Sequence, residues 1–278
     1  MIDFCDIYLI CVLYNPSDKC INKWKRFAEE FKNCIFVDNS NFDSNAKDLP
    51  NYMPLGENRG IAHAQNLGIK KVKALGGKYL IFFDQDSEVS TGLILSLLNE
   101  YKHLEAEGNK IAAIGPALIE INSGKLYKGC TPACNHPQEA DSLISSGTLT
   151  TISVIDDVGL FNDKLFIDLV DHEWCWRAKS KGYHLFMSGN SLLPHQVGKQ
   201  TINFLGFPII ISSPFRYYFQ FRNTIWLMKC NYAPKEWKRK IIVRKLIEML
   251  VVPFRTGDFT LSIKHISKGI KDGLFEHL

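Results

Sequence analysis

The 278-residue chain lacks the long apolar run that a membrane-spanning helix requires. No stretch reaches the roughly 18 uninterrupted apolar residues of such a helix. The opening residues, MIDFCDIYLICVLYNP, carry acids in place of the basic segment that begins a signal peptide. We therefore expect a cytoplasmic chain without a cleaved leader. Its hydrophobic content of 46% supports a sizeable core, in one large domain or a domain with a small appendage.

Cysteine is present, but not in the spacing of a disulfide framework. The eight cysteines are mostly scattered among apolar neighbours, which is typical of reduced thiols in a core. One cluster, Cys130, Cys134 and His136, has a loosely zinc-like spacing. A second pair of ligands is missing, so we do not expect a zinc site there.

Glycine is absent from the loop after the first predicted strand. Residues 7–14, IYLICVLY, form an unbroken apolar run that predicts a strand buried on both faces, and NPSDK follows it. A nucleotidyltransferase on a doubly wound sheet normally has a glycine-rich loop with Lys or Arg at this point. The missing glycine disfavours that class, which stays open as an alternative.

The first half of the chain alternates between strand and helix patterns. Trp24, Phe27, Ala28 and Phe31 recur at intervals of three and four and predict a helix over residues 21–31. A short strand over 35–37 follows. This alternation predicts an α/β fold, a doubly wound and mostly parallel sheet flanked by helices. Further strands are expected at 111–119, 149–155 and 183–187, with a loop or hairpin over 122–140.

The stretch around which we expect the chain to be organised is 79–90. YLIFF predicts a fully buried strand, and it ends abruptly in Asp84-Gln85-Asp86-Ser87. Ligands bind at the carboxyl ends of strands in open α/β sheets, and a hard divalent cation on a diphosphate would neutralise both carboxylates. The alternative is a strand-end turn before the helix predicted over 91–104, for which Ser90 is the expected N-cap.

A second concentration of acids lies in residues 166–182, FIDLVDHEWCWRAKSKG. Asp168, Asp171 and Glu173 fall within six residues at the start of a predicted helix, beside two tryptophans and Arg177. Aromatic walls raise the proton affinity of a carboxylate, as a general base requires. The alternative is that Asp171 caps the helix and Glu173 interacts with its dipole.

Five motifs occur in a fixed order along the chain. They are LYNP, VDNS, NRGIAHAQNLGI, FFDQDS and the acidic cluster before CWR. Each is weak alone, but together they make residues 5–230 resemble glycosyltransferase family 2, most of all its bacterial rhamnosyltransferase branch. The resemblance implies a GT-A fold with a catalytic domain over 1–230, in which a nucleotide-sugar half covers about 1–120 and an acceptor half about 120–230.

The resemblance also implies a donor site. The donor-binding residues are Asn15, Asp38, Asn58, Arg59, Gly60, Asp84 and Lys199. Asn15 and Asp38 are expected to hold the base and ribose, and Asp84 to approach the ribose or the metal. Asp86 would bind Mg²⁺ or Mn²⁺ on the diphosphate. His195 is the second candidate metal ligand, although an isolated histidine is more often a structural residue.

The acceptor side follows from the same resemblance. Its residues are Ser146, Gly147, Asp168, Glu173 and Arg177. A simple hydroxyl-rich turn also explains the serine and glycine pair. The family's acidic pair is Val170-Asp171 here, so Asp171 takes the role of catalytic base. The valine leaves open which of Asp168, Asp171 and Glu173 is the base.

The chain becomes basic towards its carboxyl end. Residues 235–278 carry ten bases and five acids, a net +5 against +4 for the whole chain. Six apolar residues are spaced for one helical face: Trp237, Ile241, Ile242, Leu246, Met249 and Leu250. We expect 231–278 to form a basic amphipathic helical tail on an anionic membrane, or a helix packed on the catalytic domain. No binding module for nucleic acid accompanies the basic residues.

These observations predict an inverting, metal-dependent glycosyltransferase. The resemblance implies dTDP-rhamnose as donor and, with the basic tail, a lipid-linked saccharide acceptor in O-antigen or capsular polysaccharide synthesis. We expect a cytoplasmic protein, peripheral on the inner face of the cell membrane. A nucleotide-sugar-binding protein without turnover is the non-enzyme alternative, which the presence of both Asp86 and Asp171 disfavours.

Overall fold

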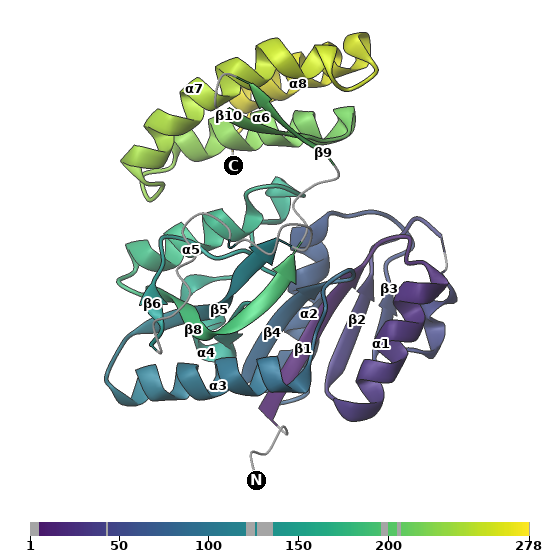
Figure 1. The fold of residues 1–278 in the computed structure, drawn as a ribbon, viewed down its shortest axis with the longest axis vertical. Coiled ribbons are helices and arrows are strands. Elements are labelled where there is room, and N and C mark those ends of the chain that lie inside the picture. Colours follow the sequence, from purple (N-terminus) through teal and green to yellow (C-terminus); the bar gives the residue numbers. More distant parts are fainter. Residues whose placement is uncertain are drawn as a thin grey trace.

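A large sheet with helices on both faces lies below a smaller layer of helices in the computed structural model (Figure 1). The structure describes residues 6–42, 44–120, 126, 136–195, 200–204 and 207–277. The strands of the large sheet are β1 (Ile7–Leu13), β2 (Cys34–Asp38), β3 (Tyr52–Pro54), β4 (Tyr79–Asp84), β5 (Ile111–Glu120), β6 (Gln138–Glu139), β7 (Leu149–Thr151) and β8 (His184–His195). Their order is β3-β2-β1-β4-β7-β5-β8-β6. Strands β7 and β6 run antiparallel to their neighbours, so the sheet is mixed but mostly parallel.

The helices of this lower part are α1 (Asp18–Glu30), α2 (Ile61–Ala74), α3 (Thr91–Ala106), α4 (Ile152–Val158) and α5 (Val170–Ser180), with the 3₁₀ turns η2 (Asn45–Asp48) and η3 (Asp163–Leu165). Helices α1 and α3 cover one face of the sheet, and α2, α4 and α5 cover the other. The predicted doubly wound α/β architecture is confirmed.

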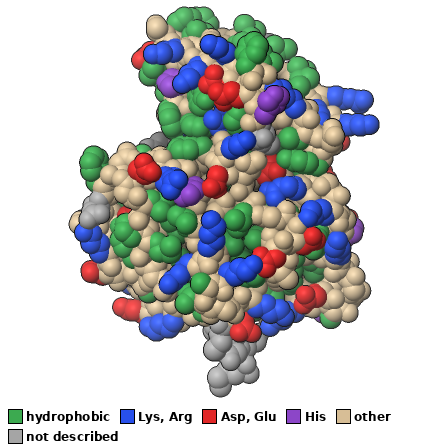
Figure 2. Space-filling view, turned by 180° about the vertical axis from the view of Figure 1, so that it is seen from behind, with side chains coloured by type: hydrophobic (Ala, Val, Ile, Leu, Met, Phe, Trp, Pro, Cys, Tyr) green, Lys and Arg blue, Asp and Glu red, His purple; other side chains and the backbone are tan. Residues whose placement is uncertain are grey.

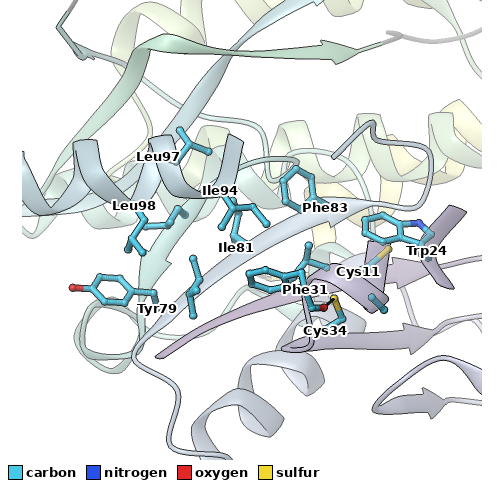
Figure 3. Close-up of a cluster of buried hydrophobic side chains, with 14 of the residues drawn as sticks. Cys11, Trp24, Phe31, Cys34, Tyr79, Ile81, Phe83, Ile94, Leu97 and Leu98 are labelled. Carbon is cyan, nitrogen blue, oxygen red and sulfur yellow. Dashed lines mark hydrogen bonds between the residues drawn. The ribbon is translucent and has the colours of Figure 1, made fainter. Parts of the chain in front are cut away.

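The unbroken apolar strands divide their side chains between these two faces. In β4, Ile81 and Phe83 join the core under α1 and α3, which Figure 3 shows, whereas Leu80 and Phe82 join the core under α2 and α5. A parallel strand buried on both faces has no polar side to alternate with. The helices begin where the sequence provides caps: the Ser90 hydroxyl accepts the N–H of Leu93 at 3.2 Å, as predicted.

Two predicted strands have different bounds in the structure. The strand expected over 149–155 stops at Thr151, because the Thr151 hydroxyl accepts the N–H of Val154 at 3.2 Å and begins α4. The apolar residues that follow therefore form a helix. The strand expected over 183–187 is longer, since β8 continues to His195.

The upper layer is built from the last third of the chain. Its elements are β9 (Gln200–Phe204), β10 (Phe207–Ile211), α6 (Pro214–Lys229), α7 (Lys235–Val251), η4 (Val252–Phe254) and α8 (Phe259–Phe275). Helices α6 and α8 pack closely because Gly269 and Gly273 lie against the α6 backbone at Tyr218 and Arg222. The predicted boundary at residue 230 falls inside this layer, and the division into domains stays a prediction.

None of the helices within the described ranges combines the length and the apolarity needed to cross a membrane. The five cysteines described as free include Cys11, Cys34 and Cys175, all buried. This agrees with the expected reduced core thiols.

Candidate active site

Three strands end together at the upper edge of the large sheet. Parallel β1, β2 and β4 pair so that Leu13 lies opposite Asp38 and Val12 lies opposite Asp84. The loop after β1 carries Asn15 to the same edge, where its N–H donates to the Ser40 hydroxyl at 2.7 Å. The structure thus brings together the predicted donor-binding residues of the first two motifs with Asp84, at the edge where open α/β sheets bind ligands.

Both carboxylate oxygens of Asp38 accept hydrogen bonds from groups of the protein. The group is 1% exposed. It accepts from the Ser40 N–H (3.0 Å) and hydroxyl (2.6 Å), the Ser44 hydroxyl (2.5 Å) and the Tyr52 hydroxyl (2.7 Å). Four donors fill the acceptor positions of a carboxylate. Asp38 therefore fixes the turn that holds Asn15, and its direct contact with a donor stays a prediction.

The Asn58-Arg59-Gly60 motif ties the end of β2 to the start of α2. Asn58 Oδ1 accepts from Asn39 Nδ2 at 2.9 Å, and Asn39 Oδ1 accepts the Arg59 N–H at 2.8 Å. Gly60 has φ 87°, and a Cβ there would lie 2.6 Å from the Phe166 carbonyl oxygen, so only glycine fits. The Arg59 side chain is half exposed beside Glu57 and is the member of the motif that faces solvent.

The Asp84-Gln85-Asp86 turn is held from both sides. The Gln85 amide accepts the Tyr14 N–H at 2.8 Å and donates to the Tyr14 carbonyl at 3.1 Å. The Gln85 carbonyl accepts from Trp24 Nε1 at 2.9 Å. These bonds leave Asp86 exposed at the tip of the turn. A groove of about 1140 Å³ runs from Asn15 and Asp86 along α1.

Three carboxylates share one region of negative potential at the end of β4. Burial, together with the charges of Asp86 and Asp171, raises the pKa of Asp84 to about 7. Asp171 comes from α5, so the fold brings the two acidic motifs of the sequence together. An anionic cluster of this kind is neutralised by a proton or by a cation.

The donor set of this cluster fits a divalent cation held jointly with a substrate. Within the described ranges, no three His, Cys, Asp or Glu side chains form a ready-made metal cage. Mg²⁺ usually keeps several waters and binds one or two carboxylates plus substrate phosphates, so exposed Asp86 beside Asp84 suits it.

The remaining candidate ligands and contacts lie outside what the structure describes. His195 ends β8, which is parallel to β5 and therefore reaches the same sheet edge, but its side chain lies outside the description. Residue Lys199 and the cysteines Cys130 and Cys134 of the zinc-like cluster also fall outside the described residues.

The three acids near the start of α5 are unequal. Glu173 is 1% exposed and pairs with Arg177 through two bonds of 2.8 and 2.9 Å. The Tyr232 hydroxyl donates to it at 2.8 Å. Asp168 pairs with Arg216 at 2.5 and 3.2 Å. Asp171 accepts the N–H of His172 and, among the described residues, makes no ion pair.

The serine and glycine turn packs behind the Asp86 turn. The Ser146 and Ser87 hydroxyls lie 2.6 Å apart, and Ser146 is 1% exposed. Gly147 has φ 81° and donates its N–H to the Phe82 carbonyl at 2.7 Å. The turn therefore supports the end of β4, and its contact with an acceptor stays a prediction.

Comparisons with known proteins agree with this geometry. A family model described as glycosyl transferase family 2 matches residues 18–129. The dTDP-rhamnosyl transferase RfbF of Shigella flexneri is 32% identical over 281 residues, which cover 94% of this chain and 93% of that protein. The chain belongs to glycosyl transferase family 2. It is therefore a glycosyltransferase, and the resemblance read from its motifs is confirmed.

Solved structures place this glycosyltransferase in the GT-A fold. A crystal structure of GalNAc-T7 with UDP, GalNAc and Mn²⁺ matches with a TM-score of 0.59 at 14% identity, over 97% of this chain and 56% of that one. S. aureus TarS matches with a TM-score of 0.54 at 14% identity, over 93% of this chain and 46% of that one. The glycosyltransferase thus spans about half the length of each.

Sequence reasoning assigned no role to several residues that shape the site. Gln85, between the two predicted acids, holds their turn, and Asn39 holds the Asn58 motif. Arg216, Arg222 and Asn223 of α6 bind the segment before Asp171. The signal for the last two was a group of adjacent polar residues, RNT, between the apolar and aromatic residues of FQFRNTIWL.

Proposed function

We propose that this glycosyltransferase moves rhamnose from dTDP-rhamnose to a saccharide acceptor with inversion of configuration. The donor is supported by the identity to the dTDP-rhamnosyl transferase of Shigella flexneri over nearly the whole of both chains. We further propose a lipid-linked acceptor and a place in the synthesis of O-antigen or capsular polysaccharide, for which the exposed surface of the upper layer is the support.

The observation that carries the mechanism is that Asp171 lies near enough to Asp84 for its charge to raise the pKa of Asp84, as the charge of Asp86 also does. The acceptor hydroxyl gives its proton to the Asp171 carboxylate as its oxygen attacks the anomeric carbon. The bond from that carbon to the diphosphate oxygen breaks on the opposite face, which inverts the centre. Glu173 and Asp168 serve less well as bases, because arginines already balance their charges.

The donor side needs a counter-charge for the diphosphate. Asp86, with His195 as a second candidate, would hold a Mg²⁺ or Mn²⁺ ion there, and the ion would stabilise the negative charge that develops on the departing nucleoside diphosphate. Arg59 and Lys199 are the proposed cationic contacts to the donor. Asn15, whose N–H donates to the Ser40 hydroxyl, is the proposed contact to the nucleoside end of the donor.

The proposed membrane contact is the outer corner of the upper layer. Leu246, Leu250, Phe254 and Phe259 are 53%, 67%, 75% and 48% exposed, and the last two rings lie 5.0 Å apart. Figure 2 shows hydrophobic side chains among Lys and Arg on the surface of the upper part of the molecule. An apolar surface bordered by basic residues suits an anionic bilayer, so we propose a peripheral protein on the cytoplasmic face.

This surface differs from the apolar stripe that the sequence suggested. Ile242, Leu246 and Leu250 are exposed as expected, and Val243 joins them. Trp237, however, lies against Trp176 of α5 with ring centroids 4.6 Å apart. One part of the predicted stripe thus packs on the catalytic core, and the other part faces outward.

The test is a donor panel with a matched acceptor series. The purified chain is incubated with dTDP-rhamnose, dTDP-glucose, UDP-glucose or UDP-GlcNAc, in Mg²⁺, Mn²⁺ or chelator, and nucleoside diphosphate release is followed with and without lipid-linked saccharide. We expect acceptor-dependent release from dTDP-rhamnose alone, and an inverted linkage in the product by NMR. Tight donor binding with no transfer to any acceptor would instead favour the binding-protein alternative.

A further inference from the structure

The segment that leads into the proposed base has a rare backbone conformation. In residues 164–169, named the base loop from here on, Phe166, Asp168 and Leu169 have φ of 63°, 65° and 66°. This left-handed region is sparsely occupied by side chains of this bulk. Such conformations persist only where the surrounding structure over-determines them, and they cluster at functional sites.

A single buried amide on α6 holds three carbonyls of the base loop. Asn223 is 0% exposed, and its Nδ2 donates to the carbonyls of Leu165 (2.9 Å), Ile167 (2.8 Å) and Asp168 (2.9 Å). Its Oδ1 accepts from Nε and Nη2 of Arg222 at 3.1 and 2.9 Å. Every polar atom of the Asn223 side chain is thereby engaged, and the amide has one orientation.

Two arginines of α6 also form hydrogen bonds to the base loop. Arg222 Nη2 donates to the Lys164 carbonyl at 2.6 Å, and its guanidinium lies 4.2 Å from the Trp226 ring centroid. At the other end of the loop, Arg216 forms two bonds to the Asp168 carboxylate. The loop is thus bound to α6 along its length, from Lys164 to Asp168.

The opposite side of the base loop is bound to the donor half of the molecule. The Phe166 carbonyl accepts the N–H of Ile61 at 2.7 Å, at the first turn of α2. The Phe166 ring stacks on Phe219 of α6, with centroids 4.6 Å apart and planes 10° apart. The loop is therefore held between α2 and α6, and Asp171 follows it by two residues.

We propose that Asn223 is a positioning residue for the transfer reaction, with Arg216 and Arg222 as its supports. Helix α6 holds the base loop in its left-handed conformation, and this conformation sets the place of the Asp171 carboxylate at the end of β4. The inference rests on the proposed role of Asp171 as base. Neither Asn223 nor the arginines need touch a substrate for this effect.

The test replaces Asn223 by Asp in the full chain. Asn223→Asp keeps the shape and the contact with Arg222 but cannot donate to three carbonyls. We expect kcat to fall at least tenfold, with the donor KM and the affinity for nucleoside diphosphate within twofold of wild type. Amide hydrogen exchange in residues 165–173 should quicken. The matched control is Thr224→Val, because the buried Thr224 hydroxyl donates to the Gln220 carbonyl of its own helix, and its kcat should stay within twofold.

A rescue distinguishes positioning from general loss of stability. Glycine adopts a positive φ without the penalty of a Cβ, so Leu169→Gly should raise the kcat of the Asn223→Asp variant at least threefold. In the wild-type background the same change should not raise kcat. This non-additivity is the signature of two residues acting on one loop conformation. An equal effect of Leu169→Gly in both backgrounds would overturn the proposal.

If Asn223→Asp does not fold, the variant Arg216→Gln tests the proposal instead. Its side chain is 43% exposed, so the fold should tolerate the change, and we expect kcat to fall three- to tenfold at constant donor KM. A kcat within twofold of wild type overturns the proposal. If the wild-type chain transfers no sugar, the proposed function fails instead, and the exchange rates of residues 165–173 in Asn223→Asp against Thr224→Val still decide whether α6 holds the loop.

Discussion

The donor edge of the sheet and the base loop are both precise, but they are held in different ways. At the donor edge, Asp38 is fixed by Ser40, Ser44 and Tyr52, all within 14 positions of it along the chain. The base loop is fixed by Asn223, which lies 55 to 58 positions away on a helix of another layer. The proposed donor site is therefore held by contacts local to the strand ends, whereas the loop before the proposed base is held by the last third of the chain.

This contrast makes donor binding and sugar transfer separable by mutation. A change at the donor edge should weaken both, since the donor must be bound to react. A change at the base or in its support should lower transfer and leave donor binding intact. The predictions below use this difference.

Asp171→Asn should have the largest effect on transfer. The change keeps the shape of the side chain and its bond from the His172 N–H but removes its basicity, so kcat should fall by roughly 10²- to 10⁴-fold. Calorimetry should show unchanged affinity for the nucleoside diphosphate. Near wild-type transfer would move the base elsewhere.

Glu173→Gln is the matched comparison for Asp171→Asn. It leaves the partly buried Arg177 without its carboxylate partner, so it should cost about 3 kcal/mol of stability. Denaturant unfolding measures that loss. If folded Glu173→Gln proved inactive while Asp171→Asn stayed active, Glu173 would be the base.

Asp86→Ala tests the donor edge. Loss of the exposed carboxylate should lower transfer by about 10²-fold, in line with the several kcal/mol that a bound metal contributes, and should abolish stimulation by Mg²⁺ or Mn²⁺. Donor affinity should fall too, unlike in Asp171→Asn. Asp84→Ala should be milder if Asp84 mainly meets the ribose. Full activity of Asp86→Ala in chelator contradicts the metal site.

The outer corner of the upper layer extends the comparison to the membrane. Replacing Leu250 and Phe254 by Ser should weaken binding to anionic vesicles at least tenfold, because burying such side chains is worth about 1.5–3 kcal/mol each. Co-sedimentation measures the binding. Phe42→Ser is the control, since Phe42 is 83% exposed on the lower part of the molecule. Equal loss in both variants, or no vesicle binding by the wild type, would rule out this corner as the contact.

The smallest expected effect concerns Asp84. Its ionisation should make the stability of the metal-free protein depend on pH. Its pKa is raised to about 7 in the folded chain by burial and by Asp86 and Asp171, against an ordinary value near 3.9 when unfolded. The folded state then binds more protons than the unfolded state between these two pH values. The contribution of Asp84 to stability is therefore fully present below about pH 4 and is lost as the pH rises towards 7.

Asp84→Asn should remove this decline. At pH 8 in chelator the variant should melt about 2–4 °C above the wild type, which corresponds to roughly 1 kcal/mol in a chain of this size. At pH 4 the two should melt together. A variant that melts lower at pH 8 would contradict the assigned cause of the shift.

The sequence predicted the strands of the sheet edge and the acids at their ends well, because the signals for them are local. Unbroken apolar runs such as 79–83 identify buried strands, and the acids after them fall at one sheet edge once the strands are parallel. The error at 152–155 had a local cause too, since the capping bond of Thr151 prevailed over the strand pattern. The pattern VDNS did not reveal that three side chains donate hydrogen bonds to the Asp38 carboxylate.

The base loop and the upper layer could not be predicted in this way. The positive φ angles at Phe166, Asp168 and Leu169 contradict the preferences of those residues and exist through contacts made much later in the chain. The apolar spacing of 235–250 showed a helix with one apolar face, but not that Trp237 would turn towards Trp176. Long-range contacts decide such features, and a single sequence does not reveal them.

The packing of α6 against α8 has a consequence for the newly made chain. Trp226 and Lys229 of α6 donate to backbone carbonyls at the end of α8, including those of Gly273 and Glu276. At roughly 5–20 residues per second, translation completes the donor edge many seconds before α8 leaves the ribosome. With the proposed roles, the strand ends that form the donor edge would be synthesised first, and the packing of α6 that supports the proposed base would be completed last.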